Sequence, residues 1–331
     1  MKNNLSKVEV KLLVQLDRNA RGSISFMAKR LRISQQLANY YFQQMLGSGK
    51  VQGFFPVIDY ARLGMLNFRV YLKIVYVNKT QLKEIVDYFV KLDEVNYVAS
   101  CGGRWDLLVG FFSRNPSQFN KTFNAALKQF SDRIKSYQIL TTIYQSIHTR
   151  KHLLRKRTGA ESQTVIIGGD REKGVYDLKD LGLLQELNRN PRASSVFLGR
   201  NLGLHPKTVV SRLKRLHKEE ILFGVKPVVN MEKTGLTQRK LLLSFHNPDF
   251  EKEQSLFQFA KEHPNIIRMV RTLGSWDVEL DCEMKDSSIF REIELNLREK
   301  FEAIIKDSEE LDLYSVYKVH FLPLYSDIVK V

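Results

Sequence analysis

Two short stretches, GRWD at residues 103–106 and GSWD at residues 274–277, decide how the chain is organised. They lie 171 residues apart and hold the two tryptophans of the 331-residue sequence. The same shift pairs further identities along the chain without a gap. They include Arg18 with Arg189, Arg21 with Arg192, Ser23 with Ser194, Phe26 with Phe197, Gly53 with Gly224 and Pro56 with Pro227. Because this period is too long for a solenoid, the pattern predicts a duplicated chain of two similar units.

Each unit is predicted to open with three short helices. Apolar residues recur at helical spacing from residue 8 to residue 45 and again from residue 183 to residue 216. Ser23 and Ser34 can cap the second and third helices of the first unit, and Pro206 stands where the last helix of the second unit begins. A tight turn before the third helix is typical of the helix-turn-helix, whose last helix enters the DNA major groove. A generic three-helix core is the alternative.

The outward side chains of the two third helices are the predicted contacts to double-stranded DNA. Arginine and lysine can reach phosphates or guanine edges, and glutamine can read adenine. Tyrosine can bond phosphates or stack on bases. The third helix of the first unit has no outward charge, so a surface for another interaction is an equally good interpretation. The two helices are therefore predicted to read different sequences. The predicted contacts are Gln36, Tyr40, Tyr41 and Gln44 in the first unit and Lys207, Thr208, Ser211, Arg212, Lys214 and Arg215 in the second.

After each helical triplet, apolar runs and amphipathic helices follow the order βαββαβ of the ferredoxin-like unit. The predicted fold class is α+β, a tandem duplication of a winged-type helix-turn-helix plus a ferredoxin-like βαββαβ domain. That fold carries many unrelated functions and names no chemistry by itself. The predicted parts are a first helix-turn-helix at 1–56, a first βαββαβ domain for effector binding or oligomerisation at 57–148, a basic linker at 149–174, a second helix-turn-helix at 175–227 and a second βαββαβ domain at 228–331.

Charge is divided unevenly between the two units. The net charge is +16, but residues 1–157 hold 26 basic against 9 acidic residues, and residues 158–331 hold 26 against 27. Separate basic regions favour nucleic acid as a partner, with solvated helix faces as the alternative. The acidic stretch from residue 227 onward is expected to face away from DNA. A hydrophobic content of 43% excludes a disordered or collagen-like chain.

Two cysteines, Cys101 and Cys282, lie far apart in apolar runs, which argues against a disulfide framework and for a reducing compartment. Neither a signal-peptide core nor a run of about 18 apolar residues is present, so a cytoplasmic protein without membrane contact is expected. The linker begins with five basic residues in positions 150–157, which could touch phosphates or be solvated, and residues 163–167 could form a short strand.

Catalytic motifs are absent from the sequence. The seven histidines include no HExxH pair, and His148 and His152 are expected to be solvated in the basic linker. No nucleophile elbow, phosphate-binding loop or dinucleotide fingerprint occurs. The sequence therefore predicts no enzyme, no cofactor and no metal site.

The complete series of elements resembles the Lrp/AsnC family of feast/famine transcription regulators. RLKRLHKEEIL (212–222) is similar to that family's recognition-helix ending, and the GRWD and GSWD stretches are similar to its effector-domain turn. The resemblance covers residues 5–147 and 175–322. It implies a DNA-binding regulator whose βαββαβ domains pair into dimers and higher oligomers and bind amino acids or similar small molecules near the Gly-x-x-Asp turn. Two fused units could instead form the family dimer within one chain.

The resemblance also directs attention to four turn residues, Gly103, Asp106, Gly274 and Asp277, as candidate effector contacts. The glycines are read first as tight-turn residues with positive φ. Each aspartate could accept a hydrogen bond from a ligand's amino group or cap backbone N–H groups. The tryptophans between them are expected to pack in the sheet.

Two alternatives to a DNA-binding regulator remain open. Sirohaem decarboxylases resemble the same family, sometimes as two fused units, and their pattern implies an arginine-rich segment and a histidine-containing strand. This chain has WDLLVGFF at 105–112 and WDVELDCE at 276–283 instead, neither with a histidine. The second alternative is a ligand-sensing scaffold that does not bind DNA.

Overall fold

The computed structural model describes residues 4–153, 164–246 and 249–322 and contains two copies of a helical triplet followed by a βαββαβ domain. The predicted fold class is confirmed. In the first copy the elements are α1 (Lys7–Asn19), α2 (Ile24–Leu31), α3 (Gln35–Gly47), β1 (Val51–Ile58), β2 (Leu66–Ile74), α4 (Lys79–Lys91), β3 (Val95–Gly102), β4 (Leu107–Ser113), α5 (Pro116–Gln129) and β5 (Ile134–Ile147). In the second they are α6 (Leu178–Arg189), α7 (Ser195–Leu202), α8 (Pro206–Lys218), β7 (Leu222–Val229), α9 (Met231–Thr234), β8 (Thr237–Phe245), α10 (Phe250–Glu262), β9 (Ile266–Leu273), β10 (Val278–Met284), α11 (Ser288–Phe301) and β11 (Ile305–Val319).

The helix starts follow the caps in the sequence. The hydroxyls of Ser23 and Ser34 accept hydrogen bonds from the backbone N–H groups of Phe26 and Leu37, both at 3.1 Å. Pro206 occupies the first turn of α8, where its missing N–H costs no hydrogen bond. Both predicted caps are confirmed, and they place α3 and α8 as the last helix of each triplet.

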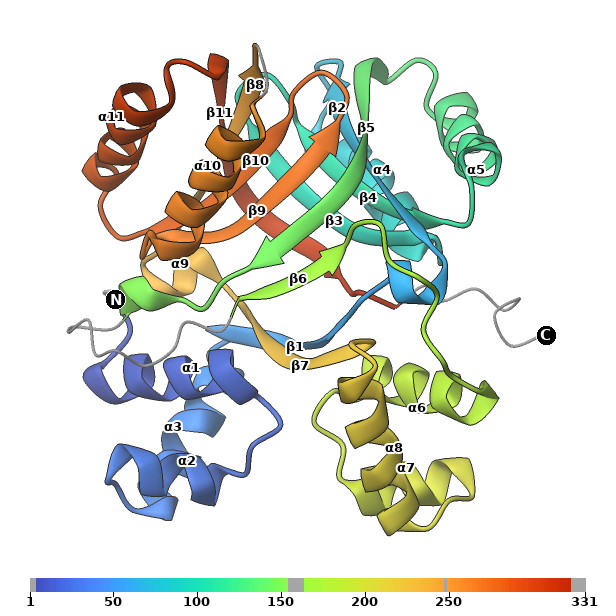
Figure 1. Cartoon of the computed structure of the whole chain (residues 1–331), viewed down its shortest axis with the longest axis vertical. Helices are drawn as coiled ribbons and strands as arrows, with labels where there is room; N and C mark the ends of the chain where they lie inside the picture. Colours follow the sequence, from blue (N-terminus) through green and yellow to red (C-terminus); the bar gives the residue numbers. More distant parts are fainter. Residues whose placement is uncertain (1–3, 154–163, 247–248, 323–331) are drawn as a thin grey trace.

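The two βαββαβ domains join into one closed β assembly (Figure 1). The strand order is β2-β4-β3-β11-β8-β10-β9-β5, and an additional pairing of β2 with β5 closes the ring. The long last strand of each copy crosses to the other copy, because β11 pairs with β3 and β5 pairs with β9. The expected dimer within one chain is therefore present.

Hydrophobic cores lie on both faces of the strands. In each copy, two helices pack their apolar sides on the outer face, α4 and α5 in the first and α10 and α11 in the second. The inner faces meet around Tyr71, Trp105 and Trp276. Both tryptophans are buried, and Tyr71 lies edge-on to Trp276 with 4.8 Å between ring centroids. Their predicted packing role is confirmed.

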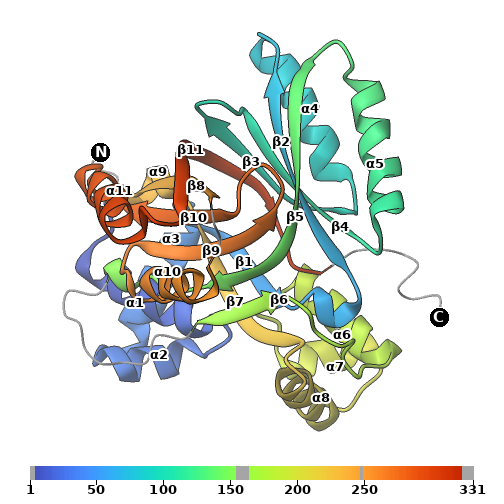
Figure 2. The same ribbon diagram turned by 45° about the horizontal axis from the view of Figure 1, so that its top comes forward.

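A two-stranded antiparallel ribbon, β1 with β7, connects the helical triplets to the β assembly. Both triplets lie on the same side of that assembly, below it in Figure 1, and the second view agrees (Figure 2). The predicted domain boundaries after residues 56 and 227 fall inside this ribbon. The linker adds the predicted strand, β6 (Val165–Gly168), which pairs with β5 outside the ring. Residues 154–163, with the rest of the basic cluster, lie outside the described residues.

Candidate nucleic-acid interface and its charged support

The exposed face of α8 holds most of the residues predicted to contact DNA. Val209 and Leu216 point into the core of the second triplet, which turns the opposite side of the helix to solvent. Five of the six predicted contacts on α8 are exposed: Lys207, Thr208, Ser211, Lys214 and Arg215. Two lysines and two hydroxyls on one helical face can bind phosphates and base edges.

Arg212 is the exception, because its side chain turns back to the start of α6. Its Nη1 donates hydrogen bonds to Asp177 at 2.7 Å and to Asp180 at 2.9 Å. Arg215 also donates to the Asp180 carboxylate. Arg212 is only 19% exposed, so its expected outward position is wrong. The reason is the α6 capping box, in which Asp177 and Asp180 place two carboxylates beside α8.

The face of α3 carries no charge, as predicted. Gln36, Tyr40 and Gln44 are exposed, with Tyr40 at 60%, whereas Tyr41 is half-buried and lies edge-on to Tyr40 at 5.4 Å. Exposed cations stand on the neighbouring helix α2, at Lys29 and Arg30. The first triplet therefore separates its uncharged reading face from cations that could hold phosphates.

Two arginines at equivalent positions lock the triplets to each other. Arg21 donates from Nη1 to the carbonyl of Pro191 at 2.8 Å and from Nη2 to that of Ala193 at 2.9 Å. Arg192 donates in the opposite direction, from Nη2 to the carbonyl of Gly22 at 3.3 Å. Its guanidinium also lies over a phenylalanine ring of the first triplet. This reciprocal contact fixes the spacing of α3 and α8.

The four candidate effector residues form two equivalent turns. Gly103 has φ +105°, the positive value expected of a tight turn. A Cβ on Gly274 would meet the Leu140 side chain at 2.9 Å, so close packing also requires glycine there. Both aspartates bind backbone N–H groups of the adjacent strand: Asp106 accepts from Ile74 and Asp277 from Phe245, each at 2.7 Å.

The second carboxylate oxygens of these aspartates also have partners within the chain. Asp106 pairs with Lys73 at 3.1 Å and Asp277 with Arg271 at 3.1 Å. The capping alternative therefore describes both aspartates, and their role toward an effector stays a prediction.

A buried chain of charges runs through the β assembly. Arg69 pairs with Glu279, Glu279 with Lys240, Lys240 with Asp281, and Asp281 with Arg268. Burial alone would raise the pKa of both carboxyls, but the neighbouring cations outweigh it and hold each pKa below its usual value. Arg69 comes from the first copy and the other four from the second, so this chain of charges joins the copies.

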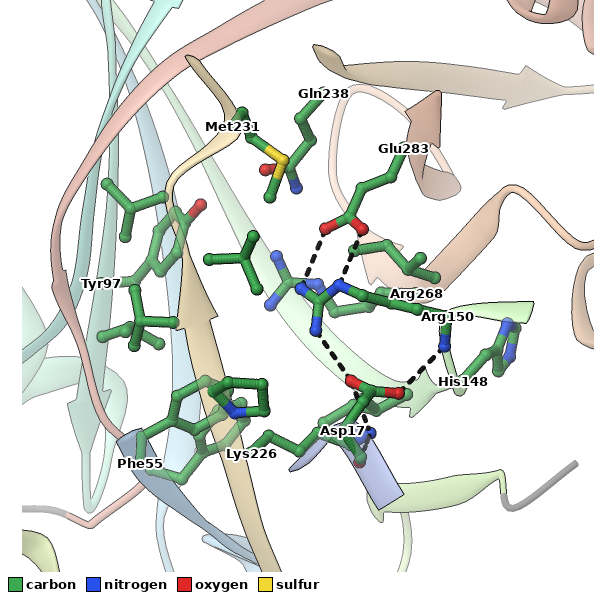
Figure 3. A pocket seen from close by; sticks show the side chains of 18 residues that line it. Asp17, Phe55, Tyr97, His148, Arg150, Lys226, Met231, Gln238, Arg268 and Glu283 are labelled. Atoms are coloured by element: carbon green, nitrogen blue, oxygen red, sulfur yellow. Dashed lines mark hydrogen bonds and ion pairs between the residues drawn. The ribbon is translucent and has the colours of Figure 1, made fainter. Parts of the chain in front are cut away.

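A second charged cluster, which we call the ionic clamp, attaches the first triplet to the β assembly (Figure 3). Arg150 donates to Asp17 of α1 at 2.8 Å and, through Nε and Nη2, to Glu283 of β10 at 2.8 and 2.9 Å. Lys226 of β7 also approaches Asp17, at 3.5 Å. Burial would raise the pKa of Asp17, but Lys226 and Arg150 hold it below its usual value. The first residue of the predicted basic cluster is thus a buried structural arginine.

His148 and His152 are buried as well, so their expected solvation is wrong. The Nδ1 of His148 lies 3.1 Å from the carbonyl oxygen of Ile266, and its Nε2 lies 3.0 Å from the Ser146 hydroxyl. Burial lowers the pKa of His148 to about 4, which keeps the ring neutral at pH 7. Among the described residues, no group of three or more His, Cys, Asp or Glu side chains is placed to hold a metal ion.

Sequence reasoning missed the charged interior. It expected the acidic stretch from residue 227 onward to face away from DNA, yet three of its acids, Glu279, Asp281 and Glu283, are fully buried. Their spacing of two was the available signal, because alternate residues of a strand face the same side. The cations opposite them come from other strands and from the linker, so their pairing could not be read from one segment.

The fold and its two exposed helix faces define a class of protein: a tandem helix-turn-helix chain whose two βαββαβ domains close on each other. The AsnC-type helix-turn-helix domain matches residues 177–217, which cover α6, α7 and most of α8. The HTH-type transcriptional regulator Ptr1 of Methanocaldococcus jannaschii is 31% identical over 34% of this chain and 74% of its own length. The leucine-responsive regulatory protein of Haemophilus influenzae is 28% identical over 36% of this chain and 72% of its own. The chain belongs to the Lrp/AsnC family of DNA-binding transcription regulators.

A solved structure shares the complete tandem arrangement. The siroheme decarboxylase NirDL superposes with a TM-score of 0.56, covering 98% of this chain and 96% of that one. The two sequences are only 10% identical, so the likeness concerns the fold. In the described part of the chain, no helix combines the length and the apolar character needed to cross a membrane.

Proposed function

We propose that the chain regulates transcription by binding an asymmetric, two-part site on double-stranded DNA, one part read by α3 and the other by α8. The observation that carries this proposal is the reciprocal contact of Arg21 and Arg192, which holds two chemically unlike recognition faces at one spacing. Identical subunits read a palindrome because both faces are alike. Two unlike faces in one chain favour half-sites of different sequence and give the protein a direction on DNA.

The proposed contacts follow from what each face exposes. On α8, Lys207 and Lys214 would bind phosphates, while Thr208 and Ser211 are short enough to lie against base edges. Arg215 and Arg212 would take part only after leaving the carboxylates of α6. On the first triplet, the predicted contacts Gln36, Tyr40, Tyr41 and Gln44 would read bases or stack, and Lys29 and Arg30 would hold phosphates beside them.

Selection of bound duplexes from a random library tests the proposal. The full chain should enrich a consensus of two different half-sites at a constant separation. Insertion of five base pairs between them, about half a helical turn, should cost most of the affinity, and ten base pairs should restore part of it only if the triplets separate. A palindromic consensus, or no enrichment, would overturn the proposal.

We further propose that a small-molecule effector such as an amino acid binds beside the first turn. A hollow there is lined by Lys73, Tyr76, Asp106 and Lys135, and the matching contacts in the second copy would be Gly274 and Asp277. The Asp106 carboxylate could exchange Lys73 for a ligand's ammonium group. Calorimetric titration with single amino acids should therefore give binding that Asp106→Asn removes, whereas unchanged binding in that variant would exclude Asp106 as a contact.

We propose finally that the chain is not an enzyme and works in the cytoplasm, where its two buried free cysteines would stay reduced. The likeness to a siroheme decarboxylase keeps one enzyme class in view. However, the strands at 105–112 and 276–283 hold no histidine, where the resemblance to that enzyme class implies one. Titration with sirohaem should leave its absorption spectrum unchanged, and a saturable spectral shift would support the decarboxylase reading.

A further inference from the structure

The two buried charge clusters differ in net charge. The ionic clamp is neutral, because Arg150 and Lys226 face Asp17 and Glu283. The chain of charges in the β assembly instead holds three cations, Arg69, Lys240 and Arg268, against two carboxylates, Glu279 and Asp281. A buried charge without a counter-charge is costly, typically by several kcal/mol. Arg268, at one end of this series, shares the Asp281 carboxylate with Lys240 and lies over the Tyr97 ring, so the described residues compensate its charge only in part.

Arg268 is the last residue in this series of ion pairs. Its side chain lines a cavity between the β assembly and the β1–β7 ribbon. Arg268 binds Asp281 through Nε and Nη2, and its Nη1 has no hydrogen-bond partner among the described residues. The cavity of about 100 Å³ is lined by Arg268 and by the residues of the ionic clamp, with Arg150 next to Arg268 (Figure 3). The Arg268 side chain is 14% exposed, although it sits deep in the molecule.

Two further polar side chains border the same cavity without a hydrogen-bond partner in the described part of the chain, although the Arg268 guanidinium lies over the Tyr97 ring at 5.7 Å. Gln238 and Tyr97 are 7% and 6% exposed, and neither has a hydrogen-bond partner among the described residues. Burial raises the pKa of Tyr97 to about 12, so its hydroxyl keeps its proton and can donate. Buried polar groups are nearly always hydrogen-bonded. An amide, a hydroxyl and a guanidinium nitrogen thus converge on one small space.

We propose that this cavity binds a small carboxylate anion, with Arg268, Gln238 and Tyr97 around the carboxylate group. The charge count favours an occupant with a single negative charge. A zwitterionic amino acid would leave the surplus in place and would need an acceptor for its ammonium group, whereas the cavity's carboxylates, Asp17 and Glu283, are already paired.

The rest of the lining sets the size and character of the ligand. Phe55, Met231, Val316 and Val319 form apolar walls. An engineered cavity of about 150 Å³ holds a benzene molecule, so about 100 Å³ suits a carboxylate with one or two further carbons. Acetate and propionate match both the polar and the apolar walls, and chloride matches only the charge.

The cavity lies between the ionic clamp and the ribbon that carries both triplets. An occupant would therefore stabilise the attachment of α1 to the β assembly. This consequence for DNA affinity rests on the proposed function, but the binding of the anion does not. Calorimetry without DNA therefore tests the site alone, and a later comparison of DNA affinity with and without propionate tests the coupling.

The experiment is a calorimetric and thermal-melting titration of the full chain in a buffer whose only anion is gluconate. Acetate or propionate should bind and raise the melting temperature, and chloride should bind at least tenfold more weakly. Arg268→Gln removes the surplus charge while leaving Arg69, Lys240, Glu279 and Asp281 balanced, so the variant should fold but lose at least about tenfold in propionate affinity.

Two more variants keep the outcome decisive. Gln238→Leu keeps the side-chain volume and should weaken binding without changing the charge. Arg239→Gln is the matched control, since Arg239 is next in sequence but pairs with Glu310 and Asp312 on the outside. The proposal is overturned if propionate does not bind, if chloride binds equally well, or if Arg268→Gln and Arg239→Gln behave alike.

Discussion

Four equivalent positions beneath the two helical triplets carry opposite kinds of chemistry. Beneath the first lies the ionic clamp of Asp17, Arg150, Lys226 and Glu283. The residues 171 positions away, in the same order, are Asn188, Phe321, Phe55 and Phe112. Phe55 and Phe321 stack with 5.5 Å between ring centroids, and together with Phe112 they belong to the hydrophobic core beneath the second triplet.

This difference shows what fusion of two units permits. In a symmetric homodimer each residue occurs on both sides of the axis, so four charges beneath one triplet would be repeated beneath the other. A single chain can place charges at one attachment and aromatic rings at the other. At these four positions the first triplet therefore has interactions that respond to pH and to ions, and the second has apolar burial that does not.

The largest effect is expected from removing the centre of the clamp. Arg150→Met leaves Asp17 and Glu283 buried without their main cation, which typically costs about 3–5 kcal/mol. Urea denaturation at pH 7 should show this loss. At lower pH the two carboxyls of the variant can take up protons and become neutral, so its deficit relative to the parent should shrink.

Phe321→Ala is the matched change at the equivalent position. Loss of a buried phenylalanine should cost a similar amount, about 3–5 kcal/mol, because of lost burial and a cavity. Its deficit should not depend on pH, since no charge is left unpaired. If both deficits changed equally with pH, the contrast between an ionic and an apolar attachment would be wrong.

Mild acid should affect the two attachments alike. His148 follows β5 and His320 follows β11, and burial lowers the pKa of each to about 4. In the unfolded chain their pKa is about 6.5, so unfolding takes up protons below that pH. Stability is complete above pH 6.5 and should fall by about 2 kcal/mol per histidine on going to pH 5. Replacing both with glutamine should flatten this dependence, as measured by urea titration at several pH values.

A loss that persisted between pH 6.5 and 5 in the double glutamine variant would assign the effect to other groups. The depressed carboxyls cannot be the cause there. The pKa values of Asp17, Glu279 and Asp281 lie below their usual range, so their contribution is complete above about pH 5 and is lost only in stronger acid.

The recognition helices should differ in how salt affects them. Lys207→Gln with Lys214→Gln on α8 removes two phosphate-binding charges, which should lower the slope of log affinity against log salt by about 2. Gln36→Ala with Tyr40→Ala on α3 should weaken binding by about 1–3 kcal/mol at one half-site without changing the slope. Fluorescence anisotropy on the selected duplex measures both. A changed slope in the α3 variant would show that this face also neutralises phosphates.

The sequence alone predicted the elements well, because each depends on local signals. Caps such as Ser23 and Ser34, the apolar periodicity and the 171-residue repeat are all readable within one segment or by self-comparison. The repeat, together with the resemblance to the Lrp/AsnC family, also implied that the two βαββαβ domains could pair within one chain. Strand pairings such as β1 with β7 needed the three-dimensional arrangement, since neither strand marks its partner.

The site was less accessible to sequence reasoning for the same reason. Arg212 was placed outward because helical periodicity within α8 carries no information about the carboxylates that α6 brings next to it. His148 was expected to be solvated, and Arg150 either to touch phosphates or to be solvated. Both instead contact residues more than 100 positions away, Ile266 and Asp17. Polar residues are hard to place from sequence, because burial of a charge depends on partners from distant segments.

The smallest expected effect concerns the turn before each recognition helix. Gly203 ends α7 with φ +62°, and its counterpart Arg32 ends α2 with φ +57°. A side chain in this left-handed conformation costs roughly 1–2 kcal/mol, which glycine avoids. Arg32→Gly should therefore stabilise the first triplet, by less than that amount because glycine also loses more entropy on folding.

Gly203→Ala is the reciprocal test of this turn. A Cβ there would meet nothing within 4 Å, so only the backbone cost should appear, about 1 kcal/mol of lost stability. Thermal melting of the two variants should give shifts of opposite sign. If both variants shifted the melting temperature in the same direction, the Arg32 side chain would have to make contacts that offset the cost of its backbone conformation. The two turns would then be stabilised differently, like the two sets of equivalent positions beneath the triplets.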